Sequence, residues 1–172
     1  DRGSPVSIQI VRTEIWLLNT FQSAVWQRFL GTRRRYTLFN EEKPMIRERK
    51  HYPDIAPTGR THVRALRYGD LMFMSGCTAL GTDARGKSLV EQARRTLEKI
   101  KKIVEREGCT MSDIVKLTTY VTNVQEYRDH ENEIDDVWAE LFEGDYPANT
   151  LIGVASLAQE GLDLEVEVIL GF

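Results

Sequence analysis

The run of residues 146–170 constrains the fold most, because its apolar and polar residues alternate as they do in β-strands. Residues 146–158 predict one strand, and residues 162–170 predict a second, joined to the first by a short connection that contains a glycine. A strand with an apolar face and an acidic face forms the wall of a core on one side and a polar site on the other. In the second strand the apolar face consists of Leu164, Val166 and Val168, and the acidic face of Asp163, Glu165 and Glu167.

Composition and charge restrict the classes of function. The chain has 172 residues and a mass of 19.8 kDa, with 41% hydrophobic and 28% charged residues, which is typical of one soluble domain with an appendage. A net charge of −3 gives no basis for a nucleic-acid partner, and no apolar run approaches the roughly 20 residues of a membrane span. Two cysteines and three scattered histidines do not predict a disulfide framework or a metal site, so we expect a cytoplasmic protein.

Residues 1–44 differ in character from residues 45–172, which we expect to form the folded domain. No acidic residue occurs between Ile15 and Asn40, whereas four arginines do, and apolar residues recur at helical spacing. Three interpretations stay open for this segment: a mitochondrial transit peptide, upstream or vector-derived sequence before a natural start at Met45, and an added helix that packs on the domain or on a neighbouring subunit.

The rest of the chain predicts strands, a helix, a strand, a helix and then the two strands described above. Two amphipathic helices can cover only one face of such a sheet, so we expect the other face to pack in an oligomer. The predicted strands cover residues 46–52, 61–68, 71–74 and 113–122, and the predicted helices cover residues 88–107 and 124–142.

Short signals set the boundaries of these elements. Gly69 with Asp70 predicts a hairpin turn, and Ser75 with Gly76 is expected to end the buried strand that follows. Ser88 with Glu91 three residues later is a capping box, which predicts the start of the first helix.

In order and spacing, these elements resemble the RidA/YjgF family of reactive-intermediate deaminases, over residues 60–171. The resemblance implies an α+β, chorismate-mutase-like fold, a homotrimer built on the sheet faces and ligand pockets at the subunit interfaces. The segments that carry it are YGDLMFMSG at 68–76, EQAR at 91–94, LEKI at 97–100, DIVKLTTYVT at 113–122, YPA at 146–148 and LEVE at 164–167.

The family hydrolyses enamines and imines such as 2-aminoacrylate to a 2-keto acid and ammonia, without a metal or an organic cofactor. That chemistry needs a cation for the substrate carboxylate, a carboxyl group that orients water and exchanges protons, and backbone donors that fix the substrate. Carried over by position, the resemblance implies Glu165 as the catalytic carboxyl group. It implies a substrate-binding set of His62, Ser75, Gly76, Asn149 and Thr150.

Asn149 departs from the family, whose arginine at this position grips the substrate carboxylate. An amide donates hydrogen bonds but carries no charge. We expect the absence of an ion pair to weaken binding of the substrate carboxylate by ~2–4 kcal/mol, about 30- to 1000-fold. His62 or Arg60 is a candidate for a substitute charge. The second helix and the loop at 158–162 are also slightly longer than the family pattern, near the implied pocket.

Two functions from different classes follow. The first is a cofactor-independent hydrolase of a small imine, enamine or related carbonyl compound, with a substrate class altered by Asn149. The second is a trimeric small-molecule binding protein without turnover, a sensor or scavenger. A cation facing Glu165 would favour the enzyme, whereas a cleft with only Asn149, Thr150 and apolar residues would favour a neutral ligand. A ribonuclease label is attached to the family, but the charge pattern does not support it.

Overall fold

The computed structural model describes residues 45–172, so the predictions for residues 1–44 lie outside the described residues. No helix within the described residues is long and apolar enough to cross a membrane. The elements are β1 (Arg47–Lys50), β2 (Ala65–Tyr68), β3 (Leu71–Thr78), α1 (Leu89–Arg106), the 3-10 turn η2 (Met111–Asp113), β4 (Ile114–Val121), α2 (Val124–Asp129), α3 (Glu131–Phe142), β5 (Ala148–Gly153) and β6 (Leu164–Gly171).

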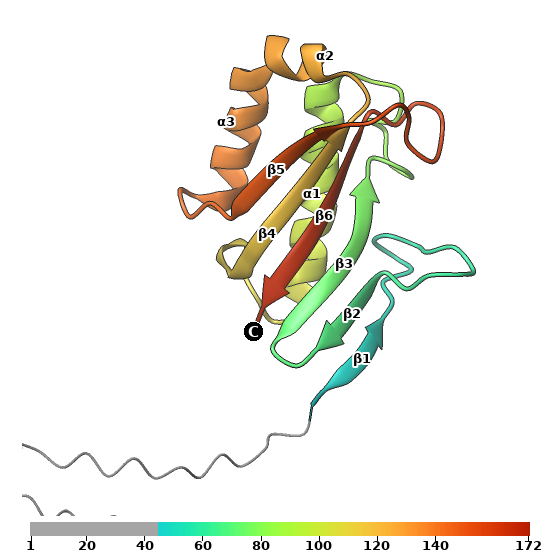
Figure 1. Ribbon diagram of the computed structural model, residues 1–172, viewed down its shortest axis with the longest axis vertical. Coiled ribbons are helices and arrows are strands. Elements are labelled where there is room, and N and C mark those ends of the chain that lie inside the picture. Colours follow the sequence, from blue (N-terminus) through green and yellow to red (C-terminus); the bar gives the residue numbers. More distant parts are fainter. Residues whose placement is uncertain (1–44) are drawn as a thin grey trace, which may run out of the picture. The chain divides into compact units, whose positions relative to one another are not determined.

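The strands form one mixed sheet in the order β1-β2-β3-β6-β4-β5, and only the β4–β5 pair is parallel. Figure 1 shows α1 and α3 together on one face of this sheet, which confirms the predicted α+β arrangement. The short, charged strand β1 lies at the edge of the sheet. The opposite face carries no helix of the described chain and is called the open face below.

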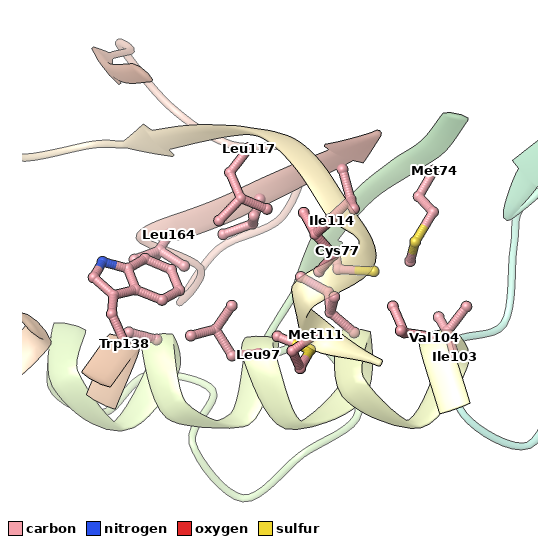
Figure 2. Close-up of a cluster of buried hydrophobic side chains, with 14 of the residues drawn as sticks. Met74, Cys77, Leu97, Ile103, Val104, Met111, Ile114, Leu117, Trp138 and Leu164 are labelled. Atoms are coloured by element: carbon pink, nitrogen blue, oxygen red, sulfur yellow. The ribbon is translucent and has the colours of Figure 1, made fainter. Parts of the chain in front are cut away.

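The core fills the space between α1, α3 and the sheet (Figure 2). The apolar side of α1 is fully buried at Leu97, Ile100 and Val104, and the apolar side of β6 is buried at Leu164 and Val166, as the alternation predicted. The helix begins at the predicted capping box, in which the Ser88 hydroxyl accepts a hydrogen bond from the Glu91 N–H at 3.3 Å.

Strand β3 differs from its prediction in two ways. It is not wholly buried, because Leu71 and Phe73 point to the open face and are 40% and 44% exposed, whereas Met72 and Met74 point into the core. Ser75 and Gly76 also do not end the strand; pairing with β6 shifts register between Met74 and Cys77 and then continues to Thr78. The irregularity is a β-bulge, which absorbs the extra residues and bends the strand.

The predicted helix at 124–142 is two helices. His130 ends α2 and begins α3, with φ of −116° and ψ of 20°, and its N–H is shared between the carbonyls of Glu126 and Tyr127. The break lets Tyr127 on α2 and Ile134 on α3 both reach the core, where they are 7% and 0% exposed.

Strands β5 and β6 are consecutive in the chain but are not neighbours, because β4 lies between them. The connection at 154–163 therefore crosses the end of β4 and is longer than predicted. Asp163 belongs to this connection and not to the acidic face of β6: its carboxylate accepts hydrogen bonds from Thr122 at 2.9 Å and from Gln92 at 3.0 Å.

Gln92 fixes the start of β6 from within the core. It is fully buried on α1, its amide donates to the Lys87 carbonyl and the Asp163 carboxylate, both at 3.0 Å, and its carbonyl accepts from the Asp163 N–H at 2.9 Å. The position at which the chain enters β6 therefore depends on the hydrogen bonds of the Gln92 side chain.

Replacing Gln92 by leucine should lower the free energy of unfolding by roughly 2–4 kcal/mol, because the shape is kept while the partner N–H and carbonyl lose their bonds. Urea unfolding of the full chain measures the change. Gln159→Leu, at an exposed loop position, is the matched control and should change stability by less than about 0.5 kcal/mol. Equal effects of the two substitutions would contradict the role of Gln92.

Candidate functional site

Glu165 lies on the open face, near the start of β6, one of the central strands of the sheet. In β6 it pairs with Thr78 of β3 on one side and with Tyr120 of β4 on the other, and its side chain is half-buried. Glu167 follows two residues later on the same face and accepts a hydrogen bond from the Tyr120 hydroxyl at 2.9 Å. The alternation of β6 therefore places both predicted carboxylates on one surface.

The bulge in β3 lies directly against the Glu165 carboxylate. A Cβ built at Gly76 would overlap Oε1 of Glu165 and would approach its Cγ to 2.8 Å. Only a residue without a side chain leaves the carboxyl group in this place. Gly76 and Glu165 therefore fit directly against each other in the fold.

Burial is the main cause that raises the pKa of Glu165 above its ordinary value, and the Glu167 carboxylate adds to the effect. The positive charge of Arg64 acts in the opposite direction. A carboxyl group with a raised pKa gives up and regains a proton more readily near neutral pH than an exposed one does, which suits general acid–base chemistry.

Arg64 is a cation beside this site that no sequence pattern indicated. The residue is only 7% exposed, yet no ion pair of the described region includes it. Its guanidinium donates to four carbonyls instead: Ala56 at 3.2 Å, Pro57 at 3.1 Å, Ser75 at 3.3 Å and Gly76 at 2.6 Å. It therefore fastens the loop before β2 to the bulge, and its positive charge acts on the Glu165 carboxylate without forming a direct ion pair.

A second cation, the half-buried Lys99, lies at the end of β3. Lys99 of α1 donates to the carbonyls of Thr78 and Leu80, both at 2.8 Å, and burial lowers its pKa. Between the two cations lies Cys77, 2% exposed, where burial raises the pKa of the thiol. Cys77 is therefore a buried core residue and not an activated nucleophile.

Two of the predicted substrate-binding residues have other surroundings than expected. The Ser75 hydroxyl donates to the Val63 carbonyl at 2.8 Å, so its proton is already engaged within the bulge. His62 lies in the loop before β2, because that strand begins only at Ala65, and its ring faces Gly59. None of the contacts found within residues 45–172 joins His62 to Glu165.

Asn149 and Thr150 lie on opposite faces of the edge strand β5. Asn149 accepts a hydrogen bond from the Thr119 hydroxyl at 3.1 Å, and Thr119 is fully buried on the helix side of β4. Thr150 pairs with Thr118 and accepts a hydrogen bond from the Lys116 ammonium group on the open face. Within one chain, therefore, the sheet separates Asn149 from Glu165.

Asn149 instead borders a cleft between α3 and β5, which we call the α3/β5 cleft. Its volume is about 460 Å³, and its lining includes Asp135, Asp136, Trp138 and Tyr146 besides Asn149. This cleft could not be predicted from the sequence, because the helical spacing of 124–142 does not show where the helix lies along the strand. Within residues 45–172, no three His, Cys, Asp or Glu side chains are arranged to hold a metal ion.

A mixed sheet with helices on one face, a bulged strand and a carboxylate opposite that bulge define an α+β domain of the YjgF type. The chain matches the family model described as endoribonuclease L-PSP over residues 54–170, and it belongs to that family. The predicted RidA/YjgF resemblance is thereby confirmed.

Three known proteins illustrate the relationship. A RutC family protein from Haemophilus influenzae is 32% identical over 110 residues, which cover 63% of this chain and 84% of that protein. A 2-iminobutanoate/2-iminopropanoate deaminase from Dermatophagoides farinae is 29% identical over 111 residues, which cover 62% of this chain and 81% of that protein. A YjgF-family structure from Mycobacterium tuberculosis superimposes with a TM-score of 0.60 at 26% identity and covers 74% of this chain and all of that one.

Gly76→Ala should lower the pKa of Glu165 toward its ordinary value, because the new methyl group displaces the carboxyl group toward solvent and removes part of the burial that raises it. Carbon-13 NMR titration of the side-chain carboxyl groups measures the shift. Gly171→Ala in the same sheet is the control, since its Cβ would meet its nearest neighbours at 3.6 Å. An unchanged Glu165 pKa in Gly76→Ala would contradict the steric fit.

Proposed function

We propose that the protein is a cofactor-independent hydrolase that converts a small imine or enamine to the corresponding carbonyl compound and ammonia. The observation that carries the proposal is the half-buried Glu165 carboxyl group, held against the Gly76 bulge with a raised pKa. The name of the Dermatophagoides farinae relative, an imine deaminase, supports the same reaction class.

In the proposed reaction Glu165 exchanges protons and forms no covalent bond. Its ionised form takes a proton from a water molecule as the oxygen attacks the carbon of the protonated imine, which gives a neutral carbinolamine. Its protonated form then gives that proton to the carbinolamine nitrogen. The carbon–nitrogen bond breaks as the carbonyl forms, and the departing ammonia takes up the proton that the hydroxyl group loses. One imine and one water are consumed for each carbonyl compound and ammonia, so no oxidant or reductant is needed.

The proposal also concerns the class of substrate that the site accepts. Asn149 carries no charge, and the guanidinium of Arg64 is buried and already bound to four carbonyls. Neither residue offers a free cationic fork to a carboxylate on the substrate. We therefore expect poor binding of simple 2-imino acids.

The active assembly is proposed to be a homotrimer packed through the open face. Glu165 and Asn149 lie on opposite faces of one sheet, so they can border one ligand only when they come from two copies of the chain. The open face also carries large apolar residues that a monomer would leave in water: Tyr68 is 49%, Leu71 40%, Phe73 44% and Ile152 38% exposed.

Light scattering should give a mass of three times the 19.8 kDa of one chain. Phe73→Asp should reduce it to the monomer mass, because a carboxylate in the middle of the apolar part of the open face would have to be buried without a partner. Lys102→Asp, on the exposed side of α1, is the control and should leave the trimer intact. A native chain that is monomeric would overturn the two-copy site.

A second function, a trimeric small-molecule binding protein without turnover, has one observation in its favour. Arg64 and Lys99, the two cations described beside the bulge, already donate hydrogen bonds to backbone carbonyls, so a substrate beside Glu165 would have to compete with those carbonyls for them. The enzyme and the binding protein differ in whether product forms, which the next experiment measures.

Ammonia release from 2-iminopropanoate generated in situ tests the hydrolase. We expect a low native rate, an increase of about 30- to 1000-fold in kcat/KM for Asn149→Arg, and a loss of about 100-fold or more for Glu165→Ala in either background. Glu160→Ala, at an exposed loop position, is the control. If neither the native chain nor Asn149→Arg accelerates hydrolysis, or if Glu165→Ala keeps the full rate, the proposal fails and the binding protein takes its place.

A further inference from the structure

The α3/β5 cleft has the size of a small-molecule site. Its volume of about 460 Å³ falls within the range of ligand pockets, roughly 300–1,000 Å³, and apolar side chains form most of its wall. It opens beside Asn149, the position where the family resemblance implies the residue that holds one end of the substrate.

Aromatic rings form one side of the cleft. Trp138 and Phe142 lie one turn apart on α3, and Tyr146 follows in the loop after the helix; successive ring centroids are 6.2 Å and 6.5 Å apart, with planes tilted by 58° and 51°. Trp138 and Phe142 are almost wholly buried, whereas Tyr146 is 59% exposed, so its ring remains available to a ligand. Rings with accessible faces attract organic cations through their quadrupole.

The charged residues of this cleft are all acidic. Asp135 and Asp136 line it, both are exposed, and neither takes part in an ion pair found in the described part of the chain. The ion pairs of α3 use other carboxylates: Glu140 binds Arg94 and Glu133 binds His130. No lysine or arginine of residues 45–172 lines the cleft, and Asn149 adds none.

We propose that the α3/β5 cleft binds a positively charged group of the substrate, an ammonium or iminium next to an apolar body, with Asp135 and Asp136 as the residues that determine this specificity. A substrate carboxylate in the same place would meet two like charges and no compensating cation. A cation would meet two carboxylates and an aromatic face, in a cleft that excludes part of the water.

This inference rests on the proposed function, and it gives the substrate class of that site: imines that carry a positive charge and lack a carboxylate. Hydrolysis of such an iminium consumes one water and yields a carbonyl compound and ammonium. The cleft of one copy would hold the cation while Glu165 of another copy exchanges the proton, because the sheet separates the two within one chain.

Isothermal titration calorimetry on the full chain tests the charge preference with three probes of similar shape: benzylammonium, benzyl alcohol and benzoate. We expect benzylammonium to bind at least about tenfold more tightly than benzyl alcohol, and benzoate to give no binding. The double variant Asp135→Asn, Asp136→Asn should lose the preference. The matched control is Glu131→Gln, Glu133→Gln, which removes the same charge from exposed positions of α3 that do not line the cleft. Equal binding of the three probes, or an equal loss in the control, would overturn the inference.

Ammonia release separates this inference from the proposed function. Benzaldimine, formed in situ from benzylamine by a flavin-dependent amine oxidase, should be hydrolysed faster than 2-iminopropanoate by the native chain, and the aspartate double variant should reverse the order. Hydrolysis of 2-iminopropanoate without benzylammonium binding would reject the charge preference and keep the hydrolase. Benzylammonium binding without hydrolysis of either imine would keep the cleft assignment and reject the hydrolase.

Discussion

The fit between Gly76 and Glu165 is the constraint on which the site depends. The bulge must come close enough to β6 that no side chain fits at residue 76, and Arg64 holds it there through the carbonyls of Ser75 and Gly76. The same guanidinium binds the loop carbonyls of Ala56 and Pro57, so strand, bulge and loop share one anchor. A buried charge that only carbonyls satisfy is costly to form, and it persists because removing it would leave several acceptors without donors.

The face of β6 was predictable because the period of two is a property of the extended backbone and needs no knowledge of neighbours. Glu165 and Glu167 therefore lie where the alternation placed them. Asp163 does not, because its hydrogen-bond partner Gln92, 71 residues earlier in the sequence, holds it in the connection before β6. Arg64 escaped prediction for a related reason: a charged residue is expected at the surface, and only the three-dimensional arrangement of four carbonyls makes its burial favourable.

The helix at 124–142 shows what periodicity can and cannot determine. Its apolar spacing correctly predicted a helical segment against the core, but not the break at His130, which no glycine or proline marks. Nor does the spacing show which exposed residues of α3 face β5. Asp135 and Asp136 were not among the predicted site residues, and they became candidates for ligand binding only when the structure placed them in a cleft with Asn149.

Two features of this cleft support each other: the uncharged Asn149 and the aspartates at 135 and 136. If only the arginine were missing, the pocket would be neutral, and a carboxylate would bind weakly through amide hydrogen bonds. With two unpaired aspartates beside Asn149, the electrostatic preference changes sign, because the nearest charges now repel an anion. Glu165 and its bulge are unaffected, since they lie on the other face of the sheet. A site divided between two faces, and hence between two copies in the proposed trimer, can change the charge it binds while the carboxyl group that exchanges protons stays the same.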